Sequence, residues 1–298
     1  MYFKNRNSIF QHFKEDKIMK IGAMASSIRL PLPEAAAKFQ DMRLSGIQLF
    51  ATSELLSYSG REISEAKKIC ADAGLEISAV CGDMTSLRFG VTSEMSERVN
   101  IVKKIIDLTC KLDSRIVTTH IGVVPEDVND PVFQNMAESI GECAEYAAKC
   151  GAFFAIETGP EAAETLLKLI ESVNSNGLKV NFDPANLRMV SCIDPVHAVE
   201  VLGKYIIHTH AKDGINLTPG SPAARYKMYH ADGSLRSIPD PVPVFKEVPL
   251  GEGQVPWSDY LAALKKVGYN GFLTIEREQG DTREKDIRHA ADFLRERI

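Results

Sequence analysis

From residue 19 onward, short apolar runs alternate with longer stretches in which apolar residues recur every three or four positions. The short runs have the length of buried strands, and the long stretches have the period of amphipathic helices. Eight apolar runs are present, at residues 20–24, 46–50, 75–80, 115–120, 152–157, 178–183, 205–210 and 271–276. The helical stretches lie near residues 33–45, 61–73, 93–112, 131–150, 160–175, 194–203, 257–267 and 282–297.

Eight strand–helix units in succession predict parallel strands that are joined by right-handed helical crossovers. Eight is also the number of units that closes a (β/α)8 barrel. The competing open doubly wound sheet usually carries G-x-G-x-x-G after its first strand, and this chain has AMASSIRLP there instead. We therefore predict an α/β fold in which residues 1–298 form a single TIM-barrel domain.

Four glycines mark the expected ends of helices. Gly74, Gly151, Gly177 and Gly268 each follow a helical stretch and precede an apolar run by a few residues. A left-handed backbone conformation is common just past a helix, and glycine adopts it without steric cost. We expect all four to end their helices in this conformation.

Two segments lie outside the alternating pattern. Residues 1–18 precede the first strand and form a short N-terminal arm, whose phenylalanines could cover one end of the barrel or a neighbouring subunit. Residues 214–256 follow the seventh strand and are rich in proline and glycine. A loop of this length is uncommon unless it is functional, so we interpret it as a rim insertion or lid and not as a second domain.

Composition and charge limit the classes of partner. The 298 residues include 35 Lys and Arg against 40 Asp and Glu, a formal charge of −5, which does not favour a nucleic-acid partner. The six cysteines form no C-x-x-C pair, as expected for reduced thiols in a cytoplasmic protein. No run of 18 apolar residues and no signal peptide are present, so we expect no membrane association and a cytoplasmic location.

The ends of the last four strands carry side chains that bind metals. They are Glu157 in AIETGPE, Asp183 in VNFDPAN, His210 in IIHTHAKDG and Glu276 in LTIERE. Barrel enzymes build their sites where strands lead into helices, so these side chains would meet at one rim. Three converging carboxylates would repel one another unless a cation lay among them. Three carboxylates and one imidazole suit Mn²⁺ or Mg²⁺, and Co²⁺ and Zn²⁺ remain alternatives.

The four strand-end motifs also resemble those of a known protein family. Together with GEGQVPW (residues 251–257), they make residues 20–297 resemble the sugar phosphate isomerase/epimerase group of xylose isomerase-like TIM barrels. In that group one Glu, one Asp, one His and a second Glu bind a divalent metal. The matching positions are Glu157, Asp183, His210 and Glu276, with His210 favoured over His208. The resemblance implies a small carbohydrate substrate and a homo-oligomer, either a dimer or a tetramer.

The resemblance implies proton transfer next to a carbonyl through a metal-stabilised enediolate. Glu157 and Glu276 would act as acid and base on opposite sides of the sugar. Epimerisation and aldose–ketose isomerisation both fit this scheme. A lyase or dehydratase on the same scaffold is the main alternative, as in inosose and dehydroshikimate dehydratases or in subunits that cleave oxidised glycosides. A non-catalytic sugar-binding barrel is a more distant one. An apurinic endonuclease would need many histidine ligands and a basic face, which this chain lacks.

The expected sugar-binding residues differ from those of the ketose 3-epimerase branch. Asn186, Asn216 and Ala163 stand where that branch has His, Arg and Glu, so a free-ketose 3-epimerase is disfavoured. Asn186 remains a candidate substrate contact. The insertion offers replacements, of which Arg225 is the first candidate and Lys227 and His230 are others.

Three further polar residues occupy strand ends. His120 in TTHIG faces the expected site, either as a substrate contact or as a structural hydrogen-bonding group. Lys212 would either contact a substrate oxygen or pair with Asp213. His208 lies one layer below His210 and is expected to be a buried structural histidine.

Overall fold

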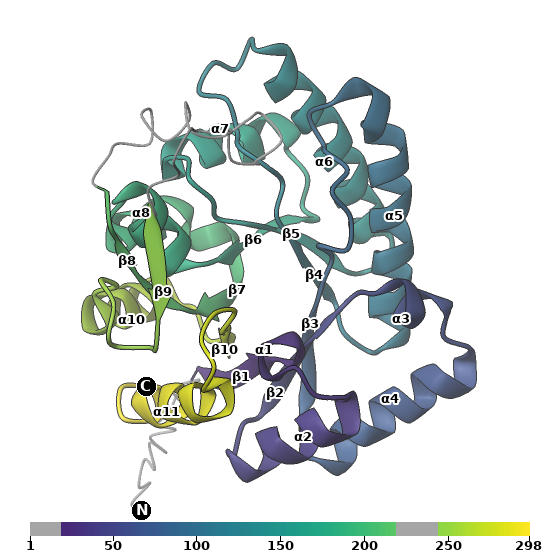
Figure 1. Ribbon diagram of the computed structural model, residues 1–298. Coiled ribbons are helices and arrows are strands. Elements are labelled where there is room, and N and C mark those ends of the chain that lie inside the picture. Colours follow the sequence, from purple (N-terminus) through teal and green to yellow (C-terminus); the bar gives the residue numbers. More distant parts are fainter. Residues whose placement is uncertain (1–18, 219–243) are drawn as a thin grey trace, which may run out of the picture.

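The computed structural model describes residues 19–218 and 244–298, and its centre is a closed barrel of eight parallel strands (Figure 1). Around the barrel the strands follow the order β1-β10-β7-β6-β5-β4-β3-β2. Their bounds are β1 (Lys20–Met24), β2 (Gly46–Phe50), β3 (Glu76–Cys81), β4 (Ile116–Thr119), β5 (Phe153–Glu157), β6 (Leu178–Phe182), β7 (Ile206–Ala211) and β10 (Phe272–Ile275). All eight lie where the apolar runs predict strands, and the barrel prediction is confirmed.

Helices surround the barrel in Figure 1, and each predicted helical stretch contains one. They are α2 (Leu32–Asp41), α4 (Gly60–Asp72), α5 (Thr92–Lys111), α6 (Pro131–Lys149), α7 (Ala163–Val173), α8 (Pro195–Leu202), α10 (Trp257–Lys266) and α11 (Arg283–Arg295). The sequence did not predict four short helical elements: α1 (Ala25–Ile28), α3 (Ser53–Ser57), a π-helical turn η1 (Asn186–Val190) and a 3₁₀ turn η2 (Gly203–Tyr205). A single turn is too short to show a helical period.

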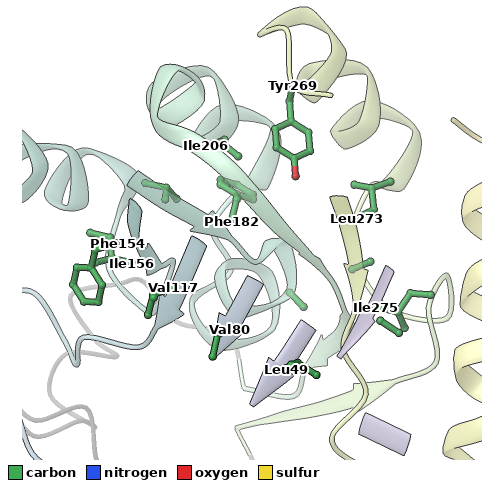
Figure 2. Packing of buried hydrophobic residues seen from close by; sticks show 14 of the residues in the cluster. Leu49, Val80, Val117, Phe154, Ile156, Phe182, Ile206, Tyr269, Leu273 and Ile275 are labelled. Carbon is green, nitrogen blue, oxygen red and sulfur yellow. The ribbon is translucent and has the colours of Figure 1, made fainter. Parts of the chain in front are cut away.

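The main core lies between the strands and the surrounding helices. Figure 2 shows part of this layer, including Val80, Val117, Phe182 and Leu273, all of which are fully buried. Residues of the opposite parity point into the barrel, because successive side chains of a strand lie on opposite faces. Removing apolar side chains from water stabilises the fold by about 25 cal/mol per Å².

The described ends of the insertion form a rim hairpin. β8 (Asp213–Asn216) pairs antiparallel with β9 (Phe245–Val248), and both strands pack against η1. Buried Asp213 holds this hairpin to the next segment, because it accepts hydrogen bonds from Trp257 Nε1 (2.8 Å) and the backbone NH of Gly251 (3.0 Å). The arm, residues 1–18, and the middle of the insertion, residues 219–243, lie outside the described residues.

One of the four glycine predictions is wrong. Gly74, Gly151 and Gly268 have φ of 70°, 70° and 80°, as expected for left-handed helix ends. The left-handed residue after α7 is Asn174 (φ 49°), not Gly177. Gly177 is required for a different reason, since a Cβ there would lie 2.0 Å from the carbonyl oxygen of Ala144.

Within residues 19–218 and 244–298, none of the helices combines the length and the hydropathy of a bilayer-spanning segment.

Candidate metal centre and its cavity

The four metal-ligand candidates converge at the rim where the strands lead into helices. Glu157 ends β5, Asp183 directly follows β6, His210 lies near the end of β7, and Glu276 directly follows β10. One potential ligand atom from each residue lies within 4.8 Å of the ligand atoms of the other three. We call Glu157, Asp183, His210 and Glu276 the four-ligand group.

Imidazole and carboxylates face one another at close range in this group. His210 Nδ1 lies 3.1 Å from Glu276 Oε2, 3.4 Å from Glu157 Oε1 and 3.9 Å from Asp183 Oδ2. All four residues are buried. Burying three carboxylates together is costly unless positive charge compensates them.

One buried oxygen of the group has no hydrogen-bond partner. Asp183 Oδ1 accepts from the backbone NH of Ala185 (2.7 Å) and Asn186 (3.1 Å), whereas Asp183 Oδ2 has no partner among the described residues. A buried polar atom without a partner requires an explanation. A divalent cation within reach of the other three ligands would provide one, so the residues fit a metal site.

Asparagine side chains fix the orientation of Glu157. Asn181 Nδ2 donates to Glu157 Oε2 at 2.9 Å, and Asn186 Nδ2 donates to Oε1 at 3.0 Å. Asn186 also lines the cavity described below. It begins the π-helical turn η1, an element that often occurs at functional sites. Asn186 therefore holds a carboxylate of the group, whether or not it also contacts a substrate.

A glutamine orients His210. Gln48 Nε2 donates to Thr118 Oγ1 (2.8 Å), which directs Gln48 Oε1 towards His210 Nε2 at 3.1 Å. With Nε2 donating to Gln48, Nδ1 is the nitrogen that faces the carboxylates and would bind a metal. Such outer contacts set the tautomer and ring orientation of metal-binding histidines.

Lys212 pairs with acids but not with Asp213. Its Nζ contacts Glu276 Oε2 (3.2 Å) and Glu278 Oε2 (2.5 Å), and its side chain is buried. Asp213 instead accepts hydrogen bonds from the rim hairpin and Trp257. This geometry favours Lys212 as a positioning residue for Glu276.

The pKa values of the group follow from burial and from these charges. Burial raises the pKa of Asp183 to about 7, and the charges of Glu157 and Glu276 add to the rise against the opposing charge of Lys212. Burial alone would raise the pKa of Glu276, but the charges of Lys212 and His210 outweigh it and hold this pKa below its usual range. Burial alone would lower the pKa of His210, but the charges of Glu157 and Glu276 raise it well above its usual value.

A cavity of about 760 Å³ opens beside the group, and Glu157, Glu276 and Asn186 form part of its wall. His120 also lines it, with its side chain about half exposed. His120 Nδ1 lies 2.7 Å from Asp83 Oδ2, and Nε2 lies 3.4 Å from Glu157 Oε1. The charge of Glu157, reinforced by Asp83 against the effect of burial, raises the pKa of His120 to about 10.

His208 is a buried structural residue, as expected. Its Nδ1 lies 2.8 Å from Asn181 Oδ1, and its Nε2 lies 2.9 Å from Thr274 Oγ1. Burial lowers the pKa of His208 well below its usual value, so its ring is neutral. Because it fixes Asn181, it also supports Glu157 indirectly.

The remaining candidates lie elsewhere. Asn216 is on β8 and donates to the carbonyl oxygen of Met189 (2.6 Å), and Ala163 is the first residue of α7. Neither is part of the cavity wall. Arg225, Lys227 and His230 fall in residues 219–243, outside the described part of the chain.

Sequence reasoning did not identify several polar residues of the site. Gln48, Asp83 and Asn181 hold the histidines and carboxylates, and Arg29 and Arg283 line the cavity. For Gln48 and Asn181 a signal existed, since each is a polar residue inside a predicted buried strand. Asp83 lies in a loop, and Arg29 and Arg283 lie at helix ends, where a polar side chain carries no such signal.

Comparison with known proteins identifies relatives that cover most of the barrel. A family model described as xylose isomerase-like TIM barrel matches residues 36–297. An uncharacterized protein from Methanocaldococcus jannaschii is 25% identical over 204 residues, which are 62% of this chain and 60% of that protein. The matched region thus spans less than two thirds of that relative.

Solved structures share the fold. A xylose isomerase domain protein from Planctomyces limnophilus has a TM-score of 0.76 and 24% identity, covering 94% of this chain and 96% of its own. A D-tagatose 3-epimerase-like protein has a TM-score of 0.70 and 21% identity, and the match covers 93% of this chain and 96% of that protein. The probable 3-DHS dehydratase from Bacillus anthracis has a TM-score of 0.72 and 17% identity, and the match covers 94% of this chain and 100% of that protein.

Proposed function

Because the chain belongs to the xylose isomerase-like TIM barrel family, we propose that it is a divalent-metal-dependent isomerase or epimerase of a sugar or sugar derivative. The observation that carries this proposal is the four-ligand group, two of whose carboxylates form part of the wall of a cavity of about 760 Å³. That volume lies within the range of small-molecule sites. Structural neighbours that are named as epimerases agree with it.

Glu157, Asp183, His210 and Glu276 would hold the ion. Three oxygen ligands and one imidazole favour Mn²⁺ or Mg²⁺. When bound, the ion would supply Lewis-acid stabilisation of negative charge on substrate oxygens.

Glu157 and Glu276 are the proposed proton-transfer groups. Both reach the cavity, and each is oriented by buried partners, Asn181 and Asn186 for Glu157 and Lys212 for Glu276. One carboxylate takes a proton from the carbon next to a carbonyl, and the other returns a proton to that carbon or its neighbour. Return to the opposite face of the same carbon gives an epimer, and return to the neighbouring carbon gives an isomer.

One observation favours elimination as a second candidate. His120 is fixed by Asp83 and faces Glu157 from the cavity, which provides a third group able to move a proton. An elimination needs an acid for the leaving oxygen in addition to the base at carbon. A structural neighbour is named as a probable dehydratase.

Deuterium exchange tests the proposal. The Mn²⁺-loaded chain is incubated in D₂O with a panel of ketoses, keto-inositols and keto sugar derivatives, and proton NMR follows the carbon next to the carbonyl. We expect exchange with retained carbon skeleton for at least one substrate, and none with Glu157→Gln. Loss of water or of an aglycone from the same substrate would favour the lyase instead. Absence of exchange across the panel in a chain that binds Mn²⁺ would argue against both.

A further inference from the structure

The cavity wall carries more positive side chains than the proposed proton transfer uses. Four carboxylates line the cavity: Asp83, Glu157, Glu276 and Glu278. Five arginines line it as well: Arg29, Arg88, Arg98, Arg277 and Arg283. The distribution of partners among these groups shows where unbalanced charge remains.

The carboxylates outside the four-ligand group already have cationic neighbours. Asp83 lies 2.7 Å from His120, and Glu278 lies 2.5 Å from Lys212. Two of the arginines are likewise neutralised. Arg88 lies 2.5 Å from Glu94, and Arg277 contacts both Glu247 (2.5 Å) and Asp286 (2.9 Å). A third, Arg98, is buried and donates to Thr119 Oγ1 at 2.7 Å.

Like Arg98, Arg29 and Arg283 have no carboxylate partner among residues 19–218 and 244–298, but unlike Arg98 neither of them is buried. The contacts of the Arg283 guanidinium are with two backbone carbonyls, those of Gly280 (3.2 Å from Nε) and Glu278. Arg29 is exposed, and no acid of the described chain lies within ion-pair distance of it. Both therefore keep their positive charge at the cavity wall.

The fold brings the two arginines to the same part of the rim. Arg29 follows α1 and Arg283 is the first residue of α11, and these two helices pack together, side by side in Figure 1. The backbone NH of Arg277 donates to Ser27 Oγ at 3.0 Å, which ties α1 to the loop between β10 and α11. Burial and, next, the charge of Arg29 lower the pKa of Arg283, as expected for two cations in the same region of the rim.

The backbone of Arg29 is also unusual. Its φ is 57°, in the left-handed region that favours glycine. Replacing Arg29 by glycine would therefore remove the side chain without straining the backbone.

We propose that the substrate carries an oxyanion, either a carboxylate or a phosphate, and that Arg29 and Arg283 bind it at the rim of the cavity. This inference rests on the proposed function, because it assigns the class of sugar derivative that this same site accepts. Guanidinium groups match both anions, since their N–H groups bind two oxygens at once. The two arginines thus discriminate charged from neutral sugars, while the four-ligand group and its carboxylates carry the chemistry.

Three unreactive ligands with one carbon skeleton test this assignment. Titration calorimetry on the Mn²⁺-loaded full chain compares D-glucitol, D-gluconate and D-glucitol 6-phosphate. None has a ketone or aldehyde, so binding is measured without turnover. We expect one anionic ligand to bind at least about tenfold more tightly than D-glucitol, equivalent to about 1.4 kcal/mol. Which of the two anions it is identifies the carboxylate or the phosphate as the natural group.

Substitutions then locate the anion. Arg29→Gly removes the side chain at a backbone position that suits glycine, and Arg283→Gln removes the charge but retains donors. Each should reduce the preference for the anionic ligand by about tenfold while leaving D-glucitol binding unchanged.

Arg43→Gly is a matched control. Arg43 is also exposed and left-handed (φ 55°), but it precedes β2 at the opposite end of the barrel. It should retain the full anion preference.

Equal binding of all three ligands to the unsubstituted chain would overturn the assignment, as would an anion preference that persists in both Arg29→Gly and Arg283→Gln. Neither result would affect the proposed isomerase chemistry, which fails only if deuterium exchange is absent.

Discussion

Replacing Gln48 by methionine should weaken metal binding although Gln48 is not itself a ligand. The side chain is fully buried and forms two contacts, accepting from His210 Nε2 (3.1 Å) and donating to Thr118 Oγ1 (2.8 Å). Methionine has a similar volume but can replace neither hydrogen bond. His210 then loses the contact that fixes its tautomer and directs Nδ1 towards the carboxylates.

The magnitude follows from these two contacts. A buried polar group left without its partner costs about 1–3 kcal/mol, and here both His210 and Thr118 lose one. We expect the free energy of unfolding to fall by about 2–4 kcal/mol. Loss of the outer partner of a metal-binding histidine typically lowers metal affinity about 10–100-fold, equivalent to about 1.4–2.7 kcal/mol.

Mn²⁺ titration, monitored by calorimetry or electron paramagnetic resonance, measures the metal affinity of Gln48→Met and of the unsubstituted chain. Gln48→Glu is the matched variant, because its carboxylate can still accept from His210 Nε2 and should retain most of the affinity. Chemical denaturation measures stability separately. If Gln48→Met binds Mn²⁺ as tightly as the unsubstituted chain, the inferred orientation of His210 is wrong.

Three further predictions concern the proton-transfer group, the charge of the site and the packing of the barrel. Glu157→Gln should lower kcat about 10²–10⁴-fold in steady-state kinetics while circular dichroism stays unchanged, and near-normal turnover would remove Glu157 from the mechanism. In the metal-free protein, the pKa of Asp183 is about 7, above its ordinary value of 3.8. Between about pH 4 and 7 the folded state therefore binds more protons than the unfolded chain. The free energy of unfolding should therefore fall as pH rises from about 4 to 7. Thermal unfolding should show a larger Mn²⁺-induced rise in Tm at pH 8 than at pH 5, and equal rises would contradict the raised pKa of Asp183. Gly177→Ala should destabilise by about 3 kcal/mol or more because its Cβ would lie 2.0 Å from a backbone oxygen. Gly60→Ala, whose Cβ would have no neighbour within 4 Å, should be neutral or slightly stabilising in the same denaturant titration.

The amino-acid sequence by itself determined the barrel and the positions of the four-ligand group. Strand and helix periods are local properties, and each apolar run coincides with a strand of the barrel. Parallel strands all present the same end at one rim, so Glu157, Asp183, His210 and Glu276 had to lie at that rim once the strands were identified. Their distances within 4.8 Å required the structure.

Only the tertiary structure decided which side chains act on these ligands. Gln48 and His210 are 162 residues apart, and Ser27 and Arg277 are 250 residues apart, yet each pair is in hydrogen-bond contact. Such contacts depend on barrel closure and on the paths of the loops, neither of which leaves a periodic signal in the sequence. For the same reason the unneutralised charges of Arg29 and Arg283 could not be inferred from composition, because a charge is unbalanced only relative to the side chains that folding places beside it.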